Sequence, residues 1–262
     1  MTHQHHNAKL SYQRIAIRTL CLFTFFLSLL VVQPSTIKAQ SYDEGQTVVF
    51  EPYGNSFKPY YKFSEPDVTK YIITNRWRSQ TAFTEAEKKM MYQYTYASAS
   101  PINLALEQVM GDTSQLDAQL QQSVALLDSA THKLTIPWNI IVYRYVYETF
   151  LTELGTSEEE LARYYHDKTF DPQILSAIKP GTHYTKQGFM STTAIKNAAM
   201  PHRSVELRIQ VPQGSQAAFV QPYSFYPYEM ELLFPRQCTL EIIGANLSDD
   251  HTRLLIETRL LP

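Results

Sequence analysis

The chain has 262 residues, a formal net charge of -2, 44% hydrophobic residues and 13% aromatic residues. This length and composition are those of a globular protein with one domain and a sizeable core, or with two small domains. Because basic residues are not in excess, the composition argues against nucleic acid as a partner.

The first 39 residues have the pattern of a secretion signal. Basic residues up to Arg18 precede an apolar run of 13 residues at 20–32, and a candidate cleavage site follows Ala39. The run is short for a membrane span, which needs about 20 apolar residues. We therefore predict a signal peptide at 1–39 and a secreted protein without stable membrane association after cleavage. An uncleaved anchor is the alternative.

Cysteine and histidine usage predicts neither a disulfide nor a metal site. Cys21 lies in the predicted leader, which leaves Cys238 as the cysteine of the mature chain, without an intramolecular partner. Cys238 lies in a strand-like pattern, so we expect it to pack in the core rather than act as a nucleophile. The histidines of the mature chain are scattered, without metal-ligand spacing: His132, His166, His183, His202 and His251.

Helix signals dominate the first half of the mature chain. We assign 40–62 to an extended N-terminal segment and 63–262 to one folded domain. Thr84 and Glu87 have the spacing of a capping box and predict a helix that runs to about Ser98. Other helices are predicted after Ser64 with an apolar stripe to Trp77, from Pro101, and at about 114–130.

The second half changes to a strand pattern. Residues 138–147 are β-branched and aromatic, which is typical of a strand buried on both faces. Short helices are predicted from Thr156, with capping-box spacing to Glu159, and near 172–178. Further strands are predicted at about 182–192, 204–211, 216–221, 229–234, 238–246 and 252–260. Helices followed by strands indicate an α+β fold with a mixed or largely antiparallel sheet.

Two carboxylates one residue apart, Glu229 and Glu231, lie at the start of the apolar run that predicts the 229–234 strand. Side chains alternate faces along a strand, so both glutamates are predicted to point the same way. An exposed sheet edge that carries charge to prevent strand pairing is the alternative interpretation. Two upstream features, at Arg144 and at 191–193, favour a functional site instead.

Arg144 lies inside the most hydrophobic predicted strand, where a guanidinium needs an anionic partner. That partner is either a core carboxylate or the phosphates of a ligand, which arginine binds in a bidentate manner. Ser191, Thr192 and Thr193 end another predicted strand. Their hydroxyls either reflect the strand preference of threonine or hold a carboxylate in place by a hydrogen bond.

In this order, an arginine in a strand, a Ser-Thr-Thr strand and a Glu-x-Glu pair, the chain resembles the bacterial mono-ADP-ribosyltransferases of the Arg, Ser-Thr-Ser, Glu-x-Glu type. It is most similar to their small secreted streptococcal arginine-modifying members, over most of the mature chain. The sequence segments shared with these members are long: Thr131-His132, Ile136-Pro137-Trp138-Asn139-Ile140, Val142 through Phe150, Phe189-Met190-Ser191-Thr192-Thr193-Ala194, and Glu231-Leu232-Leu233-Phe234-Pro235-Arg236.

The resemblance implies a single catalytic domain at 63–262, with a helical N-terminal part and a split β core that binds NAD as co-substrate. It implies that NAD is contacted by Arg144, Ser191, Thr192 and Asn103. It also implies that Ser191 holds the catalytic Glu231 by a hydrogen bond. Glu229 would face the acceptor and mark arginine specificity, because asparagine-modifying relatives carry Gln there. The segment 221–228 resembles the acceptor-recognition turn of the family. Its aromatic residues would contact the acceptor protein: Tyr223, Phe225, Tyr226 and Tyr228.

The chain departs from the family pattern at three positions. Thr193 replaces the final Ser of Ser-Thr-Ser and keeps a hydroxyl. Glu107 stands where relatives often place an Arg near NAD, in the helix that carries Asn103. Gln237 replaces the Gly that commonly follows Pro-Arg.

We therefore expect a secreted, monomeric, metal-free toxin that transfers ADP-ribose from NAD to arginine of a host protein, with actin or another cytoskeletal protein as a possible acceptor, and that hydrolyses NAD as a side reaction. Two alternatives stay open. A dedicated NAD glycohydrolase would not need Glu229, and a secreted adhesin, which the 18 tyrosines of the full sequence permit, would bind host protein without cleaving NAD. The glycine-rich phosphate motifs of Rossmann and nucleotide-loop enzymes do not occur in the sequence.

Overall fold

The computed structural model describes residues 62, 63, 65–67, 69, 70, 73 and 82–262, which fall within one compact unit, Gln46–Pro262. The predicted signal peptide at 1–39, nearly all of the predicted extended segment at 40–62, and most of the helix predicted after Ser64 lie outside these residues. In the described part of the chain, no helix is both long and apolar enough to span a membrane.

The helical part begins as the sequence predicts. Thr84 caps helix α3 in a capping box: its hydroxyl accepts a hydrogen bond from the Glu87 N–H, and the Glu87 carboxylate accepts one from the Thr84 N–H. The chain then continues without a break into the next helix through a π-helical turn, η2. The bounds are α3 Glu85–Gln93, η2 Tyr94–Ser98, α4 Ala99–Gln108 and α5 Ala118–His132.

Glu87 also ties α3 to α5. Its carboxylate accepts hydrogen bonds from Ser129, at 2.7 Å, and from Lys133, at 2.6 Å. Burial alone would raise the pKa of Glu87, but the hydrogen bonds from Lys133, Ser129 and Thr84 outweigh it and lower the pKa to about 2. Helices α3 and α5 are therefore joined by an ionised carboxylate that accepts hydrogen bonds from both Ser129 and Lys133.

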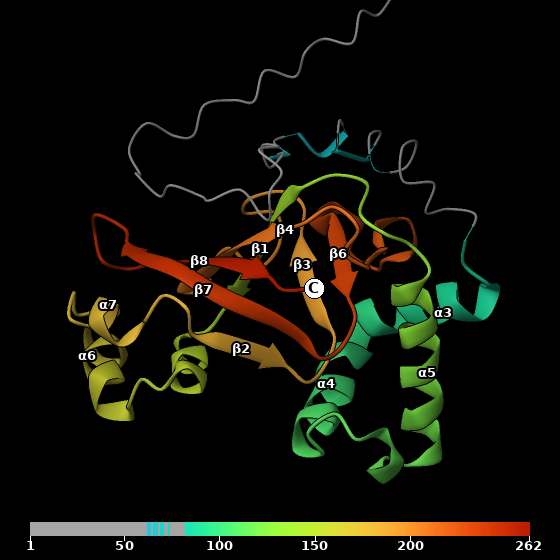
Figure 1. The fold of residues 1–262 in the computed structure, drawn as a ribbon, viewed down its shortest axis with the longest axis horizontal. Coiled ribbons are helices and arrows are strands. Elements are labelled where there is room, and N and C mark those ends of the chain that lie inside the picture. Colours follow the sequence, from blue (N-terminus) through green and yellow to red (C-terminus); the bar gives the residue numbers. More distant parts are fainter. Residues whose placement is uncertain (1–61, 64, 68, 71–72, 74–81) are drawn as a thin grey trace, which may run out of the picture. The chain divides into compact units, whose positions relative to one another are not determined.

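An eight-stranded mixed sheet forms the rest of the core, in the order β2-β7-β8-β4-β1-β3-β6-β5 (Figure 1). Among the described strands only β4 and β8 pair in parallel. The predicted α+β fold with a mixed sheet is thus confirmed. The strands are β1 Ile140–Val146, β2 His183–Lys186, β3 Met190–Thr193, β4 Val205–Val211, β5 Ala218–Phe219, β6 Glu231–Phe234, β7 Cys238–Leu247 and β8 Leu254–Leu260.

The shorter helices lie in the connections. They are the 3₁₀ turns η3 Thr113–Gln115, η4 Glu148–Leu154, η5 Gln221–Tyr223 and η6 Pro227–Glu229, and the helices α6 Glu158–Asp167 and α7 Ile174–Ala177. The capping box of α6 joins Ser157 to Glu160, one residue later than the predicted Thr156 and Glu159. Thr156 is instead buried.

Two predictions of strand extent are wrong. The predicted strand at 182–192 is two strands, because β2 pairs with β7 whereas β3 pairs with β6; Gly188, beside Asn103 of α4, lies between them. The predicted strand at 229–234 begins only at Glu231, because Glu229 ends the 3₁₀ turn η6 and Met230 is left-handed with φ 50°. Gln237, which replaces a family glycine, is also left-handed, with φ 62°.

Hydrophobic side chains bury both faces of the sheet. Helices α3, α4 and α5 lie beside β3 and β6 at one end, and α6 and α7 lie near β2 and β7 at the other (Figure 1). Leu233 of β6 belongs to the cluster of the first helices, whereas Leu232 and Phe234 belong to the larger cluster that includes Leu161 of α6. Because alternate residues share a face, Glu231 points to the same side as Leu233, toward α3 and α4.

The sheet is weakly joined at its middle. Strands β1 and β4 pair along seven residues, but β1 and β3 are in register only at Tyr143 and Thr193. The core is therefore split into a five-stranded part that ends with β1 and a three-stranded part that begins with β3. The functional side chains gather at this join.

Candidate active site

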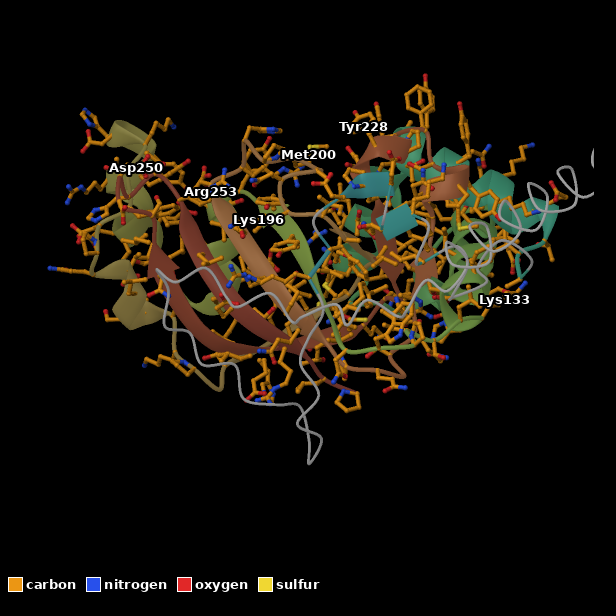
Figure 2. The ribbon with its side chains drawn as sticks, turned by 90° about the horizontal axis from the view of Figure 1, so that it is seen from above. Lys133, Lys196, Met200, Tyr228, Asp250 and Arg253 are labelled. Atoms are coloured by element: carbon orange, nitrogen blue, oxygen red, sulfur yellow. The ribbon has the colours of Figure 1, made fainter. Side chains whose placement is uncertain are left out.

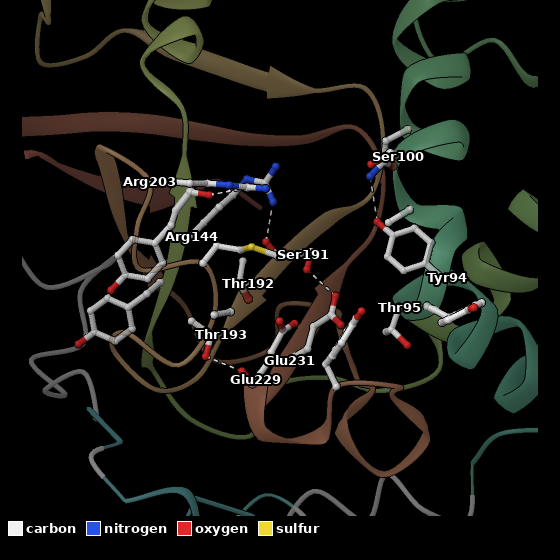
Figure 3. Close-up of a pocket in the computed structure, with 18 of the residues that line it drawn as sticks. Tyr94, Thr95, Ser100, Arg144, Ser191, Thr192, Thr193, Arg203, Glu229 and Glu231 are labelled. Atoms are coloured by element: carbon white, nitrogen blue, oxygen red, sulfur yellow. Dashed lines mark hydrogen bonds between the residues drawn. The ribbon is translucent and has the colours of Figure 1, made fainter. Parts of the chain in front are cut away.

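A cavity of about 470 Å³ lies where β1, β3 and β6 meet the π-helical turn η2 and helix α4 (Figure 3). Most of the residues singled out in the sequence line it. These are Asn103, Arg144, Ser191, Thr192, Tyr226, Glu229 and Glu231. Tyr223, Phe225 and Tyr228 do not line it and are described below.

The carboxylate of Glu231 is the most buried acid in the cavity. The Ser191 hydroxyl donates a hydrogen bond of 2.5 Å to its Oε1 atom, across the register of β3 and β6. Burial raises the pKa of Glu231 to about 7; Ser191 and the charge of Arg144 lower it, and Glu229 raises it. The hydrogen bond fixes which way the carboxylate points, as the Ser-Thr-Thr pattern predicts.

Glu229 reaches the same cavity by a different route from the predicted one. It is not two residues along a strand from Glu231, because the left-handed Met230 turns the chain between them. The Thr193 hydroxyl donates a hydrogen bond of 2.7 Å to the Glu229 carbonyl and so fastens this turn to β3. Burial raises the pKa of the Glu229 carboxyl, and Arg203 partly offsets the shift.

Arg144 projects from β1 into the cavity. Its Nη1 donates a hydrogen bond of 2.7 Å to the Ser191 carbonyl, which links the two parts of the split sheet. Burial lowers the pKa of Arg144, although arginine stays protonated in proteins. Among the described residues it forms no salt bridge, so the alternative of a core ion pair is not what the structure contains.

Arg203 is a site residue that the sequence did not reveal. It lines the cavity, its Nη1 donates 2.9 Å to the Tyr145 carbonyl, and its guanidinium lies 4.8 Å from the centre of the Tyr147 ring. Its positive charge contributes to the lowered pKa of Arg144, so two guanidinium groups are close together (Figure 3). The buried Nε of Arg203 has no partner among the described residues.

Asn103 connects α4 to the start of β3. Its Oδ1 accepts a hydrogen bond of 2.8 Å from the Phe189 N–H, and its Nδ2 donates a hydrogen bond of 2.9 Å to the Tyr94 hydroxyl. A Cβ atom on Gly188 would lie 2.5 Å from that Oδ1, so the glycine is what lets Asn103 approach. Glu107, on the same helix, pairs with Lys186 and also accepts from the Gly188 N–H.

Thr192 is the least available of the predicted contacts. Its hydroxyl donates 2.9 Å to the Leu232 carbonyl and is buried. This bond holds β3 against β6, so a structural role of Thr192 is visible in the fold.

The structure separates the four aromatic residues of the predicted acceptor turn. Tyr226 lines the cavity, and Tyr223 packs edge-on against Phe83 at 5.8 Å between ring centres. Phe225 and Tyr228 are exposed, with 39% and 64% of their surface accessible. Tyr228 and Phe225 are therefore available to a partner, whereas Tyr223 mainly anchors the turn.

The described residues hold no group of three His, Cys, Asp or Glu side chains that fits a metal ion. Cys238 packs against the larger hydrophobic cluster and its thiol donates to the Pro235 carbonyl. Burial raises the pKa of this thiol to about 12, which makes it a poor nucleophile.

Similar proteins were found by sequence and by fold. The family model "ADP-ribosyltransferase exoenzyme" matches residues 70–262. The chain is 30% identical over 190 residues to the epidermal cell differentiation inhibitor of Staphylococcus aureus, covering 70% of this chain and 76% of that protein. It is 25% identical over 209 residues to mono-ADP-ribosyltransferase C3 of Hathewaya limosa, covering 79% and 80%.

Among solved structures, C3stau2 from S. aureus with NAD superposes with a TM-score of 0.72 and 25% identity, over 78% of this chain and 99% of that one. The family model spans every cavity residue described above. The chain therefore belongs to the ADP-ribosyltransferase exoenzyme family.

Proposed function

We propose that the protein transfers ADP-ribose from NAD to an arginine side chain of a host protein. The observation that carries the proposal is the pair of glutamates at one cavity, Glu231 held by Ser191 and Glu229 held through its backbone by Thr193. One acid is buried and fixed, and the other lies on the outer turn. Two acids in different settings suit two different tasks.

The cavity also suits the donor. Arg144 and Arg203 place two guanidinium groups side by side, which matches the two charges of a diphosphate. Arg144 is free of carboxylate partners within the described residues, so binding an anion does not require breaking an ion pair. A family relative solved with NAD supports this assignment. Asn103 and Thr192 are proposed to complete the NAD contacts.

Glu231 would act on the ribose. When the bond between ribose and nicotinamide breaks, the electron pair leaves with nicotinamide and positive charge develops on the ribose. A fixed carboxylate stabilises that charge, as in glycoside hydrolysis. Because Ser191 already orients Glu231, little reorganisation is needed as the charge forms.

Glu229 would act on the acceptor. A guanidinium is protonated and a poor nucleophile, so a carboxylate beside it helps by orienting it and taking up the proton that is released as nitrogen bonds to the ribose carbon. If water takes the place of the guanidinium, the product is free ADP-ribose. This is the proposed NAD glycohydrolase side reaction.

The choice of arginine rests on the acidic Glu229 and on the resemblance to the arginine-modifying streptococcal members of the family, because asparagine-modifying relatives carry Gln there. The signal pattern at 1–39 supports secretion, and the exposed Phe225 and Tyr228 support contact with a host protein, for which actin is one candidate. We further propose a toxin that acts as a metal-free monomer.

The test is to incubate the mature protein with labelled NAD and agmatine, a soluble arginine analogue, and to follow free nicotinamide and labelled agmatine. Both products are expected from the wild type. Glu231→Gln should lower both by about 10²–10³-fold. Glu229→Gln should keep nicotinamide release and lose labelled agmatine.

Other outcomes separate the alternatives. Nicotinamide release without labelled agmatine, unchanged in Glu229→Gln, would identify a dedicated NAD glycohydrolase. Neither product from a folded sample would favour a binding protein. Full activity of Glu231→Gln would refute the site assignment.

A further inference from the structure

A hydrogen bond joins the π-helical turn η2 to the aromatic turn that carries Glu229. The Thr95 hydroxyl accepts from the Phe225 N–H at 2.9 Å and donates to the Tyr92 carbonyl at 3.0 Å. The two residues are 130 positions apart in the chain. Thr95 therefore uses one hydroxyl to fasten the middle of the turn to the helix.

Aromatic contacts reinforce the same junction. The Phe225 ring lies 4.7 Å from the Tyr96 ring and 5.8 Å from the Tyr92 ring, between ring centres. Tyr92 and Tyr96 are themselves exposed, so they serve as a surface on which Phe225 rests rather than as core. Figure 2 shows Tyr228 of this turn at the same edge as Met200, which lines the cavity.

Thr95 lies in the π-helical turn η2 and faces the aromatic turn. A π turn holds one more residue than an α turn, which shifts the faces of the residues that follow, and such turns are frequent at functional sites. Here the Tyr94 ring is buried and its hydroxyl bonds to Asn103, whereas the Thr95 hydroxyl bonds to the backbone of Phe225 and Tyr92.

The position of Glu229 depends on this turn. The Glu229 N–H donates a hydrogen bond of 3.1 Å to the Tyr226 carbonyl. Tyr226 directly follows Phe225, whose N–H donates a hydrogen bond to the Thr95 hydroxyl. Thr193 holds the far end of the turn on β3. Thr95 thus acts on the near side and Thr193 on the far side of the residues that set the Glu229 carboxylate.

We propose that Thr95 is a positioning residue for acceptor transfer: it holds the turn at 224–229 so that Glu229 meets the incoming guanidinium. This inference rests on the proposed function. It concerns Glu229 alone, because Glu231 is held separately by Ser191. Loss of the Thr95 hydroxyl should therefore impair transfer to arginine and leave cleavage of NAD by water intact.

The experiment compares Thr95→Val, which removes the hydroxyl at nearly constant shape, with Thr95→Ser, which keeps it. Thr152→Val is the matched control, because the Thr152 hydroxyl makes the same kind of local bond, to the Thr149 carbonyl at 2.8 Å, remote from the turn. For each variant, kcat/KM is measured for nicotinamide release in water and for labelling of agmatine. Hydrogen exchange of the peptide that contains Phe225 is measured in parallel.

Thr95→Val is expected to lower kcat/KM for agmatine labelling about tenfold, the effect of one lost hydrogen bond, with nicotinamide release within about twofold of wild type. Exchange at Phe225 should be faster, and Thr95→Ser and Thr152→Val should behave as wild type.

Equal labelling by Thr95→Val and Thr152→Val would overturn the inference while leaving the proposed function standing. An equal loss of both reactions in Thr95→Val would overturn it too, because the bond would then serve NAD rather than the acceptor. A wild type with neither activity would refute the proposed function itself, and the inference with it. Unchanged exchange at Phe225 in Thr95→Val would refute the positioning role independently of activity.

Discussion

At the residue scale, the carboxylate of Glu231 is buried, and its burial raises the pKa from 4.5 to about 7. An acid whose pKa is higher in the folded than in the unfolded state destabilises the fold as pH rises through that interval, because the unfolded chain then ionises more easily. A pKa shift of this size lowers the free energy of unfolding by about 3 kcal/mol above pH 7. Ionisation of the residue proposed to act on the ribose therefore lowers the free energy of unfolding.

Glu231→Gln should accordingly raise the stability of the protein at pH 8, by about 1–3 kcal/mol, and change it little at about pH 3.5, below both pKa values, where the glutamate is mostly protonated in both states. Glutamine keeps an acceptor for the Ser191 hydroxyl. Urea unfolding at the two pH values measures the difference. A variant that is less stable than wild type at pH 8 would contradict the assignment of a raised pKa.

Ser191→Ala should shift the pH dependence of NAD cleavage. The reaction needs the ionised form of Glu231, so kcat/KM should rise with pH through about 7 in the wild type. Because the hydrogen bond from Ser191 lowers the pKa of Glu231, its removal should move this rise to higher pH by about one unit. Ser191→Thr keeps the hydroxyl and should keep the profile. Identical profiles for wild type and Ser191→Ala would show that another group controls the rate.

At the element scale, the close contact of α4 with the loop before β3 rests on one glycine. Gly188→Ala should displace Asn103, because the added Cβ would lie 2.5 Å from its Oδ1. We expect a loss of about 1–3 kcal/mol in stability and weaker NAD binding, since Asn103 lines the cavity. Thermal unfolding and NAD titration measure the two effects.

Gly244→Ala is the control for that change. Gly244 lies in β7, has nothing within 4 Å of an added Cβ, and does not have a positive φ. It should keep both stability and NAD binding. If both alanine variants behaved alike, the contact with Asn103 would not be what makes Gly188 necessary.

Local patterns predicted those elements whose signals are local. The Thr84 capping box starts α3 as expected, and the β-branched run around Arg144 forms β1. Alternation alone places Glu229 in a strand, because it cannot anticipate the left-handed Met230, whose turn is held by the distant Thr193. The sequence pattern does not reveal Arg203 for a related reason: it lies in a connection, and the antiparallel pairing of β1 and β4 brings it near Arg144.

At the scale of the whole molecule, the proposed NAD site spans the join of the split sheet. Arg144 belongs to the five-stranded part, whereas Ser191 and Glu231 belong to the three-stranded part. A ligand that contacts both parts binds only the folded state and stabilises it by mass action. The stability of the fold should thus depend on NAD.

NAD at 100 times its dissociation constant should stabilise the protein by about 2.7 kcal/mol, or several degrees in Tm. The measurement is best made on Glu231→Gln, which should bind NAD without cleaving it. The double variant Arg144→Lys with Glu231→Gln should show a much smaller shift at the same NAD concentration, because a lysine cannot replace the bidentate contacts of arginine. No shift in Glu231→Gln would contradict NAD binding at this cavity.

The parallel pairing of β4 with β8 has a consequence for the order of events during synthesis. Strand β4 ends at Val211, and its parallel partner β8 begins only at Leu254, after β5, β6 and β7 have been made. A growing chain emerges with its N-terminus first, so β1 and β4 are made before β8. The edge of β4 therefore stays unpaired until β8 inserts between β4 and β7. The five-stranded half of the sheet therefore closes last, from the late end of the chain, and a ribosome that stalls before Leu254 leaves an open edge ready to pair with other chains.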